Sequence, residues 1–99
     1  MKSVTGKVVF ITGAANGIGF GIAEACAARG ARLVLADIDK AALDVAADAL
    51  KPTGSELMTV VLDVASAESW TEAAAAVQAQ FGTVDILCNN AGIGTAKSA

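Results

Sequence analysis

The feature that most constrains the fold of this chain is a regular alternation between short, β-branched apolar runs and longer alanine-rich stretches. The alanine-rich stretches repeat apolar residues at intervals of three and four, as helices do, whereas the short runs are apolar throughout. Glycine, asparagine or aspartate marks each junction. The pattern predicts alternating strands and helices. Strands that are apolar on both faces imply a parallel sheet covered by helices on both sides.

The predicted fold class is therefore α/β, a Rossmann-like doubly wound parallel sheet with four strands and three helices in strand order 3-2-1-4. We expect one partial domain over residues 1–99, truncated after the fourth strand. Either Ser66 or Ser69 can open the last helix, and Ser69 with Glu72 matches a capping box. The expected strands are 8–12, 32–37, 57–63 and 84–89, and the expected helices are 18–29, 40–51 and 67–81.

The composition removes several kinds of chemistry. Because the sequence has no histidine and no tyrosine, it cannot build a Ser-His-Asp triad, a histidine metal site or a tyrosine acid/base. A net charge of −3 with scattered basic residues argues against a nucleic-acid partner. No run resembles an export signal or a membrane span, so no membrane partner is expected. Cys26 and Cys88 have no Cys-x-x-Cys spacing, which predicts buried, reduced thiols in a cytoplasmic protein.

A glycine-rich turn follows the first predicted strand, with the sequence Thr12-Gly13-Ala14-Ala15-Asn16-Gly17-Ile18-Gly19. A helix N-terminus carries about half a positive charge on N–H groups that lack acceptors, so glycines at 17 and 19 would let a pyrophosphate approach. Gly13 lets the backbone leave the strand. The spacing is G-x-x-x-G-x-G and not the general dinucleotide motif G-x-G-x-x-G. A hairpin turn at Asn16-Gly17, or glycines that serve only packing, are the alternatives, but a helical pattern follows.

Asp37 ends the second predicted strand, where a carboxylate can accept hydrogen bonds from the adenosine ribose. The same carboxylate would repel the 2′-phosphate of NADP. Ala14, Ala15 and Ile38 supply no compensating cation, so the predicted cofactor is NAD. The alternative is that Asp37 is only a solvated strand end or a helix cap.

Four motifs together resemble those of the short-chain dehydrogenase/reductase family, and they span nearly the whole chain. They are the turn from Thr12 to Gly19, Asp37, Asp63-Val64 and Asn89-Asn90-Ala91-Gly92. Taken alone, Asp63 suggests a turn residue and Asn89 an amide that joins strands. The resemblance implies four roles: pyrophosphate binding by Gly13, Asn16, Gly17, Ile18 and Gly19; ribose binding by Asp37; an adenine frame from Asp63 and Val64; and a nicotinamide-side ribose flanked by Asn90, Ala91 and Gly92.

The same resemblance implies that the full-length protein is an oxidoreductase, interconverting a small-molecule alcohol and a carbonyl by hydride transfer with NAD. We expect the full-length protein to be a homo-oligomer. In that family catalysis depends on a serine and a Tyr-x-x-x-Lys helix beyond the fourth strand. Since no tyrosine is present, no catalytic role is given to Lys97 or Ser98. Two alternatives stay open: a complete, non-catalytic nucleotide-binding module, and a Rossmann-type methyltransferase fragment, against which the Asn89-to-Gly92 segment argues.

Overall fold

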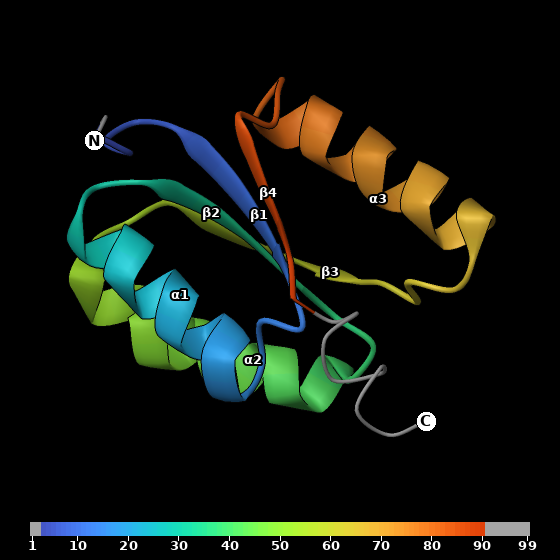
Figure 1. The fold of residues 1–99 in the computed structure, drawn as a ribbon, viewed down its shortest axis with the longest axis horizontal. Helices are drawn as coiled ribbons and strands as arrows, with labels where there is room; N and C mark the ends of the chain where they lie inside the picture. The colour runs from blue at the N-terminus through green and yellow to red at the C-terminus, as the bar shows by residue number, and fades with distance from the viewer. Residues whose placement is uncertain (1–2, 91–99) are drawn as a thin grey trace.

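The computed structural model describes residues 3–90, which form a four-stranded parallel sheet with helices on both faces (Figure 1). The strand order is β3-β2-β1-β4, so the predicted doubly wound α/β fold is confirmed. In chain order the elements are β1 (Val8–Thr12), α1 (Gly17–Ala28), β2 (Arg32–Asp37), α2 (Lys40–Leu50), the 3-10 helix η1 (Lys51–Thr53), β3 (Leu57–Val61), α3 (Ala67–Gln80) and β4 (Ile86–Asn89).

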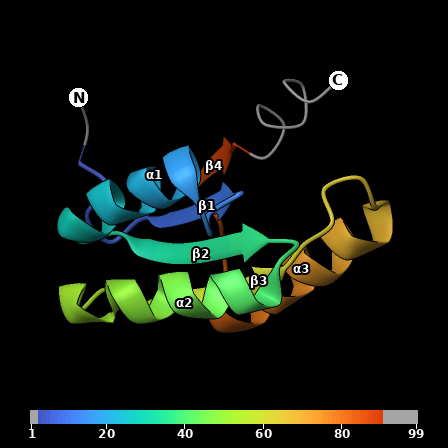
Figure 2. The ribbon, with the colours of Figure 1, turned by 90° about the horizontal axis from the view of Figure 1, so that it is seen from below.

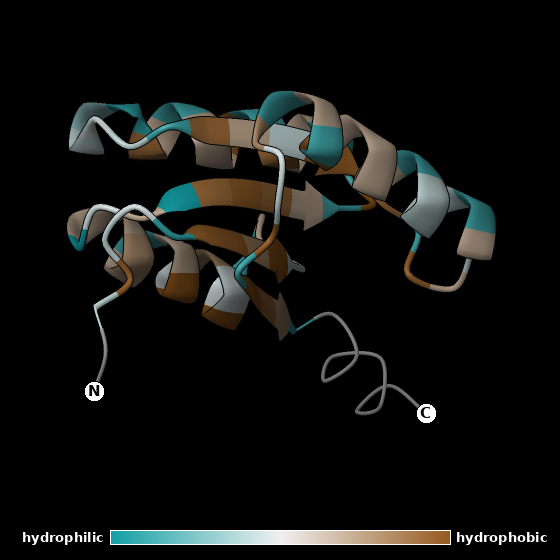
Figure 3. Cartoon of the chain, turned by 90° about the horizontal axis from the view of Figure 1, so that it is seen from above, coloured by the Kyte–Doolittle hydropathy of each residue, from teal (hydrophilic) through white to brown (hydrophobic). Residues whose placement is uncertain are grey.

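Side chains that alternate along β1 and β2 divide the core into two layers. In β1, Val9 and Ile11 pack against α1 and α2, whereas Val8 and Phe10 pack against α3. Figure 3 shows the apolar residues gathered on the strands and polar segments on the helices. In Figure 2 the arrowheads of β1 and β2 point the same way, because every strand pair is parallel. The carboxyl ends of the strands therefore share one edge of the sheet.

The two central strands and the two edge strands differ in burial. All five residues of β1 and the middle four of β2 are buried. In β4, Ile86 is 36% exposed and Leu87 is 55% exposed, because within residues 3–90 this strand pairs only with β1. The expectation that every strand is buried on both faces is correct for β1 and wrong for β4.

The ends of two strands were predicted wrongly. β3 ends at Val61 and not at 63, because Val61 pairs with Asp37, which is the last residue of β2. The Leu62 N–H still donates to the Asp37 carbonyl oxygen at 2.9 Å, but the N–H of Asp63 donates to Ser69 Oγ of α3, also at 2.9 Å. β4 begins at Ile86 and not at 84, because the preceding residue, Asp85, turns toward Val8.

The helices are shifted or shortened by one residue relative to the prediction. α1 spans 17–28 and not 18–29, α2 ends at 50 and not 51, and α3 ends at 80 and not 81. In each case the predicted last residue is the C-cap: Arg29, Lys51 or Phe81. Ser66 caps α3 by accepting the Ser69 N–H at 3.1 Å, so the capping box predicted at Ser69 is wrong.

Both cysteines are free, and both are half-buried where full burial was predicted. Cys26 of α1 and Cys88 of β4 pack against the core layer that α1 and α2 share with the sheet. Burial raises the pKa of the Cys26 thiol, Cys88 raises that pKa further, and the Arg29 guanidinium opposes the rise. A thiol that resists ionisation is a poor nucleophile, so Cys26 behaves as a small apolar packing residue.

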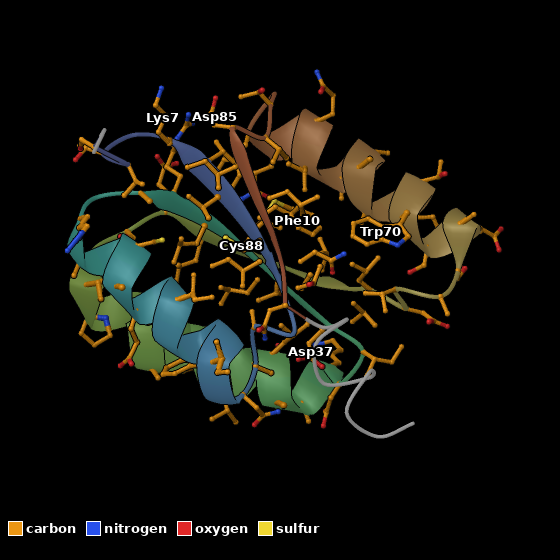
Figure 4. The ribbon with its side chains drawn as sticks, in the orientation of Figure 1. Lys7, Phe10, Asp37, Trp70, Asp85 and Cys88 are labelled. Atoms are coloured by element: carbon orange, nitrogen blue, oxygen red, sulfur yellow. The ribbon has the colours of Figure 1, made fainter. Side chains whose placement is uncertain are left out.

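Asp85, the residue directly before β4, is hydrogen-bonded to Val8, the first residue of β1. Its Oδ2 accepts the Val8 N–H at 2.8 Å, and its own N–H donates to the Val8 carbonyl oxygen at 2.9 Å. Figure 4 shows Asp85 near Lys7, at the amino end of the sheet. Because Val8 is fully buried, Asp85→Ala would leave its N–H without that acceptor. We expect the free energy of unfolding to fall by about 1–3 kcal/mol in urea denaturation.

The matched control for this stability prediction is Asp44→Ala. That exchange breaks an exposed ion pair with Lys40, whose atoms are 3.0 Å apart, and should change the free energy of unfolding by less than about 0.5 kcal/mol. Equal losses of unfolding free energy in Asp85→Ala and Asp44→Ala would show that the bond from Val8 to Asp85 stabilises the fold no more than an exposed ion pair does.

Candidate functional site

Most of the residues singled out from the sequence lie at the carboxyl edge of the sheet. Gly13 follows β1, Asp37 ends β2, Asp63 lies beyond the end of β3, and Asn90 follows β4. In open parallel sheets ligands bind outside the carboxyl ends of the strands, where the strand order reverses. Here that position lies between β1 and β4.

Within residues 3–90, α1 is the α-helix whose N-terminus no side chain caps. Asp39 caps α2 and Ser66 caps α3, whereas Asn16 makes no side-chain capping bond. The N–H of Phe20 donates to the Asn16 carbonyl oxygen, so the amides before Phe20 precede the hydrogen-bonded ladder of the helix. The first turn carries no acidic side chain, and Ile18 is 67% exposed. This helix end is positive, rich in donors and open to an anion.

The glycines of the turn have two different roles. At Gly17, where φ is +56°, an added Cβ would meet no atom within 4 Å, so the space beside its backbone is open. At Gly19 an added Cβ would overlap the Gly13 carbonyl oxygen and lie 2.9 Å from Asn90 Nδ2. Gly19 was predicted to leave room for a pyrophosphate. The structure gives a different reason for this glycine, because the Gly13 carbonyl group and the Asn90 side chain occupy the space beside it.

Asp37 is half-buried, and its carboxylate is held on both sides (Figure 4). Oδ2 accepts the N–H of Ala15 in the glycine-rich turn at 3.2 Å, and Oδ1 accepts the N–H of Asp39 at 3.2 Å. Asp39, and not Asp37, caps α2. The carboxylate is therefore fixed beside the open N-terminus of α1, and the helix-cap alternative for Asp37 is wrong.

A cavity of about 220 Å³ lies beside this carboxylate, between the carboxyl ends of β1, β2 and β3. Two exposed apolar side chains line it, Ile38 at 63% exposure and Val64 at 37%. Ile38 was not predicted to be a site residue, although an apolar residue directly after a strand-ending acid was a usable signal. The full lining is Thr12, Gly13, Ala36, Asp37, Ile38, Leu62, Asp63 and Val64.

The remaining predicted residues divide into turn, sheet and loop positions. Asp63 Oδ1 accepts the Ala65 N–H at 3.0 Å, which is a turn contact. Asn89 Oδ1 accepts the hydroxyl hydrogen of Thr12 at 3.0 Å, so Asn89 is the inter-strand amide that the sequence suggested. The Asn90 side chain lies against Gly19. Ala91 and Gly92 lie outside the described residues.

Other surfaces of the described chain suit an anionic ligand less well. Two larger depressions, of about 660 and 620 Å³, lie toward the amino ends of the strands, beside Gly54 and Ser55. They adjoin the C-terminal ends of helices, whose partial negative charge disfavours anions, although Lys51, which pairs with Asp48, lines the first depression and Arg32 lines the second. Residues 3–90 include no group of three or more acidic or cysteine side chains able to hold a metal ion. They also include no helix with the length and apolar character needed to cross a bilayer.

Comparison with known proteins agrees with this geometry. The family model described as short chain dehydrogenase matches residues 7–99. A CLA biosynthesis dehydrogenase/reductase from Lactiplantibacillus plantarum is 43% identical over 93 residues, which are 94% of this chain and 32% of that protein. A short-chain dehydrogenase/reductase from Burkholderia phymatum, solved in complex with NAD, is 40% identical with a TM-score of 0.83 over 88% of this chain and 31% of its own.

A second solved structure carries the other cofactor. L-sorbose reductase from Gluconobacter frateurii, complexed with NADPH, is 38% identical with a TM-score of 0.83 over 86% of this chain and 33% of its own. The chain thus spans about a third of the length of the relatives it matches. The family model covers almost all of this sequence, and the sheet order and the glycine-rich turn agree with it. The chain therefore belongs to the short-chain dehydrogenase/reductase family.

Proposed function

We propose that residues 1–99 form the dinucleotide-binding part of an NAD-dependent oxidoreductase. Members of the family are oxidoreductases. The observation that carries the proposal is the bond from the Ala15 N–H to Asp37 Oδ2, which is 3.2 Å long. It fixes a carboxylate beside an uncapped helix N-terminus. The carboxylate can accept hydrogen bonds from sugar hydroxyls, and the N–H groups of the helix end can donate to phosphate oxygens. Adenosine diphosphate presents those two chemical groups next to each other.

In this proposal the turn binds the pyrophosphate and the cavity binds the adenine ring. The exposed backbone at Gly17 faces open space, and Asn16 and Ile18 flank it on the surface. The 220 Å³ cavity is smaller than the roughly 300–1,000 Å³ of a pocket for a whole drug-sized ligand, so it suits one ring system. Ile38 and Val64 offer that ring apolar contact. By family resemblance, Asn90, Ala91 and Gly92 flank the nicotinamide-side ribose.

The proposed choice of NAD over NADP depends on Asp37. A 2′-phosphate on the adenosine ribose would stand beside the carboxylate that otherwise accepts the ribose hydroxyls. A nearby cation could offset that repulsion, but residues 13–19 and Ile38 carry no positive charge. The next basic side chain, Lys40, is paired with Asp44 at 3.0 Å.

The proposed reaction interconverts a small-molecule alcohol and a carbonyl compound. When bound, the cofactor would supply the hydride chemistry at its nicotinamide ring. The residues of this chain bind the adenosine diphosphate half and orient the dinucleotide across the sheet edge. The sequence has no tyrosine, so we assign none of its residues to proton transfer. The two free cysteines support a cytoplasmic location, and a homo-oligomer at full length stays a prediction.

Calorimetric titration of the purified protein with fragments of the cofactor tests this proposal. NAD and ADP-ribose should bind with one site each and with similar dissociation constants, because both contain the half that the turn, Asp37 and the cavity contact. Nicotinamide mononucleotide should bind far more weakly. Tight binding of the mononucleotide together with no binding of ADP-ribose would contradict the proposal.

A non-catalytic nucleotide-binding module is the second candidate, since the uncapped N-terminus of α1 and the Asp37 carboxylate would serve it equally well. Size-exclusion chromatography of the 99-residue chain separates the two candidates. A self-sufficient module should elute as one stable species that binds NAD. A partial domain should associate through β4, whose outer edge is unpaired within residues 3–90 and whose Leu87 is 55% exposed.

A further inference from the structure

The segment that forms one wall of the cavity, residues 62–64, lies beyond the end of its strand. β3 ends at Val61, and the last bond from this region to β2 is the Leu62 N–H to the Asp37 carbonyl oxygen at 2.9 Å. Asp63 and Val64 nevertheless line the cavity. Their position must therefore be set by something other than sheet pairing.

Two adjacent side chains in the first turns of α3 hold this wall. The Asp63 N–H donates to Ser69 Oγ at 2.9 Å, and Trp70 Nε1–H donates to the Val64 carbonyl oxygen at 3.0 Å. The Ala65 N–H donates to Asp63 Oδ1 within the turn, and the Ser66 N–H donates to the Asp63 carbonyl oxygen at 3.0 Å, which joins the turn to the N-cap of α3 through the backbone alone. Ser69 and Trp70 thus connect two peptide groups of the wall, one on each side of the Asp63–Val64 peptide bond, to a helix.

Trp70 also connects the wall to the centre of the sheet. Its ring stacks on that of Phe10, with centroids 6.0 Å apart and planes 25° apart. Phe10 lies in β1 and is only 4% exposed. Figure 4 shows the two rings between the sheet and α3. A half-buried indole stacked on a rigid central strand has little freedom to move, so its N–H is a fixed donor for the Val64 carbonyl.

We propose that Ser69 and Trp70 are positioning residues that set the affinity of this protein for the adenine half of its cofactor. Neither side chain lines the cavity, so both act through the backbone of Asp63 and Val64. The inference rests on the proposed dinucleotide site. It adds that α3, on the opposite face of the sheet from α1, contributes to adenine recognition.

Four substitutions in α3 test the inference by calorimetric titration of the purified protein with ADP-ribose and AMP. Ser69→Ala and Trp70→Phe each remove one hydrogen bond to the wall, and each should raise both dissociation constants about fivefold, the factor of one neutral hydrogen bond. Ser69→Thr keeps the hydroxyl and should restore affinity. Thr71→Val is the matched control, because Thr71 donates to Ala67 within its own helix, and it should bind like the wild type.

Urea denaturation and fluorescence separate positioning from a general loss of stability. Trp70 is the single tryptophan, so its emission in the wild type and in Ser69→Ala should change on binding ADP-ribose. If Trp70→Phe does not fold, the Ser69→Ala and Ser69→Thr pair decides. No ADP-ribose binding by the wild type would overturn the proposed function itself. Wild-type binding with unchanged dissociation constants in Ser69→Ala and Trp70→Phe, whatever their stability, would overturn only this inference.

Discussion

Replacing Asp37 by alanine is expected to remove the preference for NAD over NADP. A phosphate charge about 4 Å from the carboxylate costs about 4 kcal/mol at an effective dielectric constant near 20, which limits NADP by up to roughly a thousandfold. The variant loses that repulsion and also loses the acceptor for the ribose hydroxyls. The dissociation constant for NAD should rise at least about tenfold, the one for NADP should fall, and their ratio should approach one. Parallel calorimetric titrations measure all four constants.

The control for the charge change is Asp48→Ala. Asp48 lies near the far end of α2, where its side chain is 72% exposed and pairs with Lys51. The exchange alters the net charge by the same amount as Asp37→Ala but should leave the ratio of the two constants as in the wild type. Asp37→Asn keeps the shape of the side chain and removes its charge. The affinity for NADP should therefore rise by a larger factor than the affinity for NAD falls. An unchanged ratio in Asp37→Ala would refute the assigned role of this carboxylate.

Gly19→Ala is expected to damage both stability and dinucleotide binding, although alanine is normally the better helix former. An exposed glycine in a helix costs up to about 1 kcal/mol relative to alanine. At Gly19, however, the new methyl group would overlap the Gly13 carbonyl oxygen and press on Asn90 Nδ2. Overpacking of this kind typically costs about 1–3 kcal/mol. Because Gly13 is the first residue of the turn proposed to bind the pyrophosphate, displacing its carbonyl group would also disturb that site. We therefore expect the dissociation constant for NAD to rise at least about tenfold.

Gly21→Ala provides the comparison within the same helix. Gly21 is exposed, and a Cβ there would meet no atom within 4 Å. This variant should raise the free energy of unfolding by up to about 1 kcal/mol and leave NAD binding unchanged. Urea denaturation and NAD titration of both variants give the two readouts. If Gly19→Ala were as stable and as tightly binding as Gly21→Ala, close packing between the turn and α1 would not explain the glycine.

The sequence predicted the strands, helices and sheet order because those depend on patterns within each segment. Residues 8–11 are apolar at every position, and short right-handed crossovers leave few orders for four parallel strands. The strand ends depend on partners far away in sequence. The carboxylate of Asp85 binds Val8 across the sheet, and no pattern around residue 85 indicates that bond. The strand ends set by tertiary hydrogen bonds were therefore wrong by two residues, whereas the helix ends, which depend on local caps, were wrong by one.

The candidate site shows the same division. Asp37 could be recognised because an acid at the end of a strand is a local feature. The sequence could show that Gly19 lacks a side chain, but not that the Gly13 backbone fills the space. Ser69 matched a capping box with Glu72, yet its hydroxyl is directed to the Asp63 N–H instead. Nothing in the sequence around Trp70 indicates its bond to the Val64 carbonyl oxygen, which depends on how the chain is folded.

A crystal structure of the protein soaked with NAD tests the proposed dinucleotide site without any substitution. We expect density for the diphosphate at the N-terminus of α1, over the open backbone of Gly17, with the adenosine ribose hydroxyls within hydrogen-bonding distance of Asp37. Density for the dinucleotide at the amino ends of the strands, or none at a saturating concentration, would contradict the proposed site.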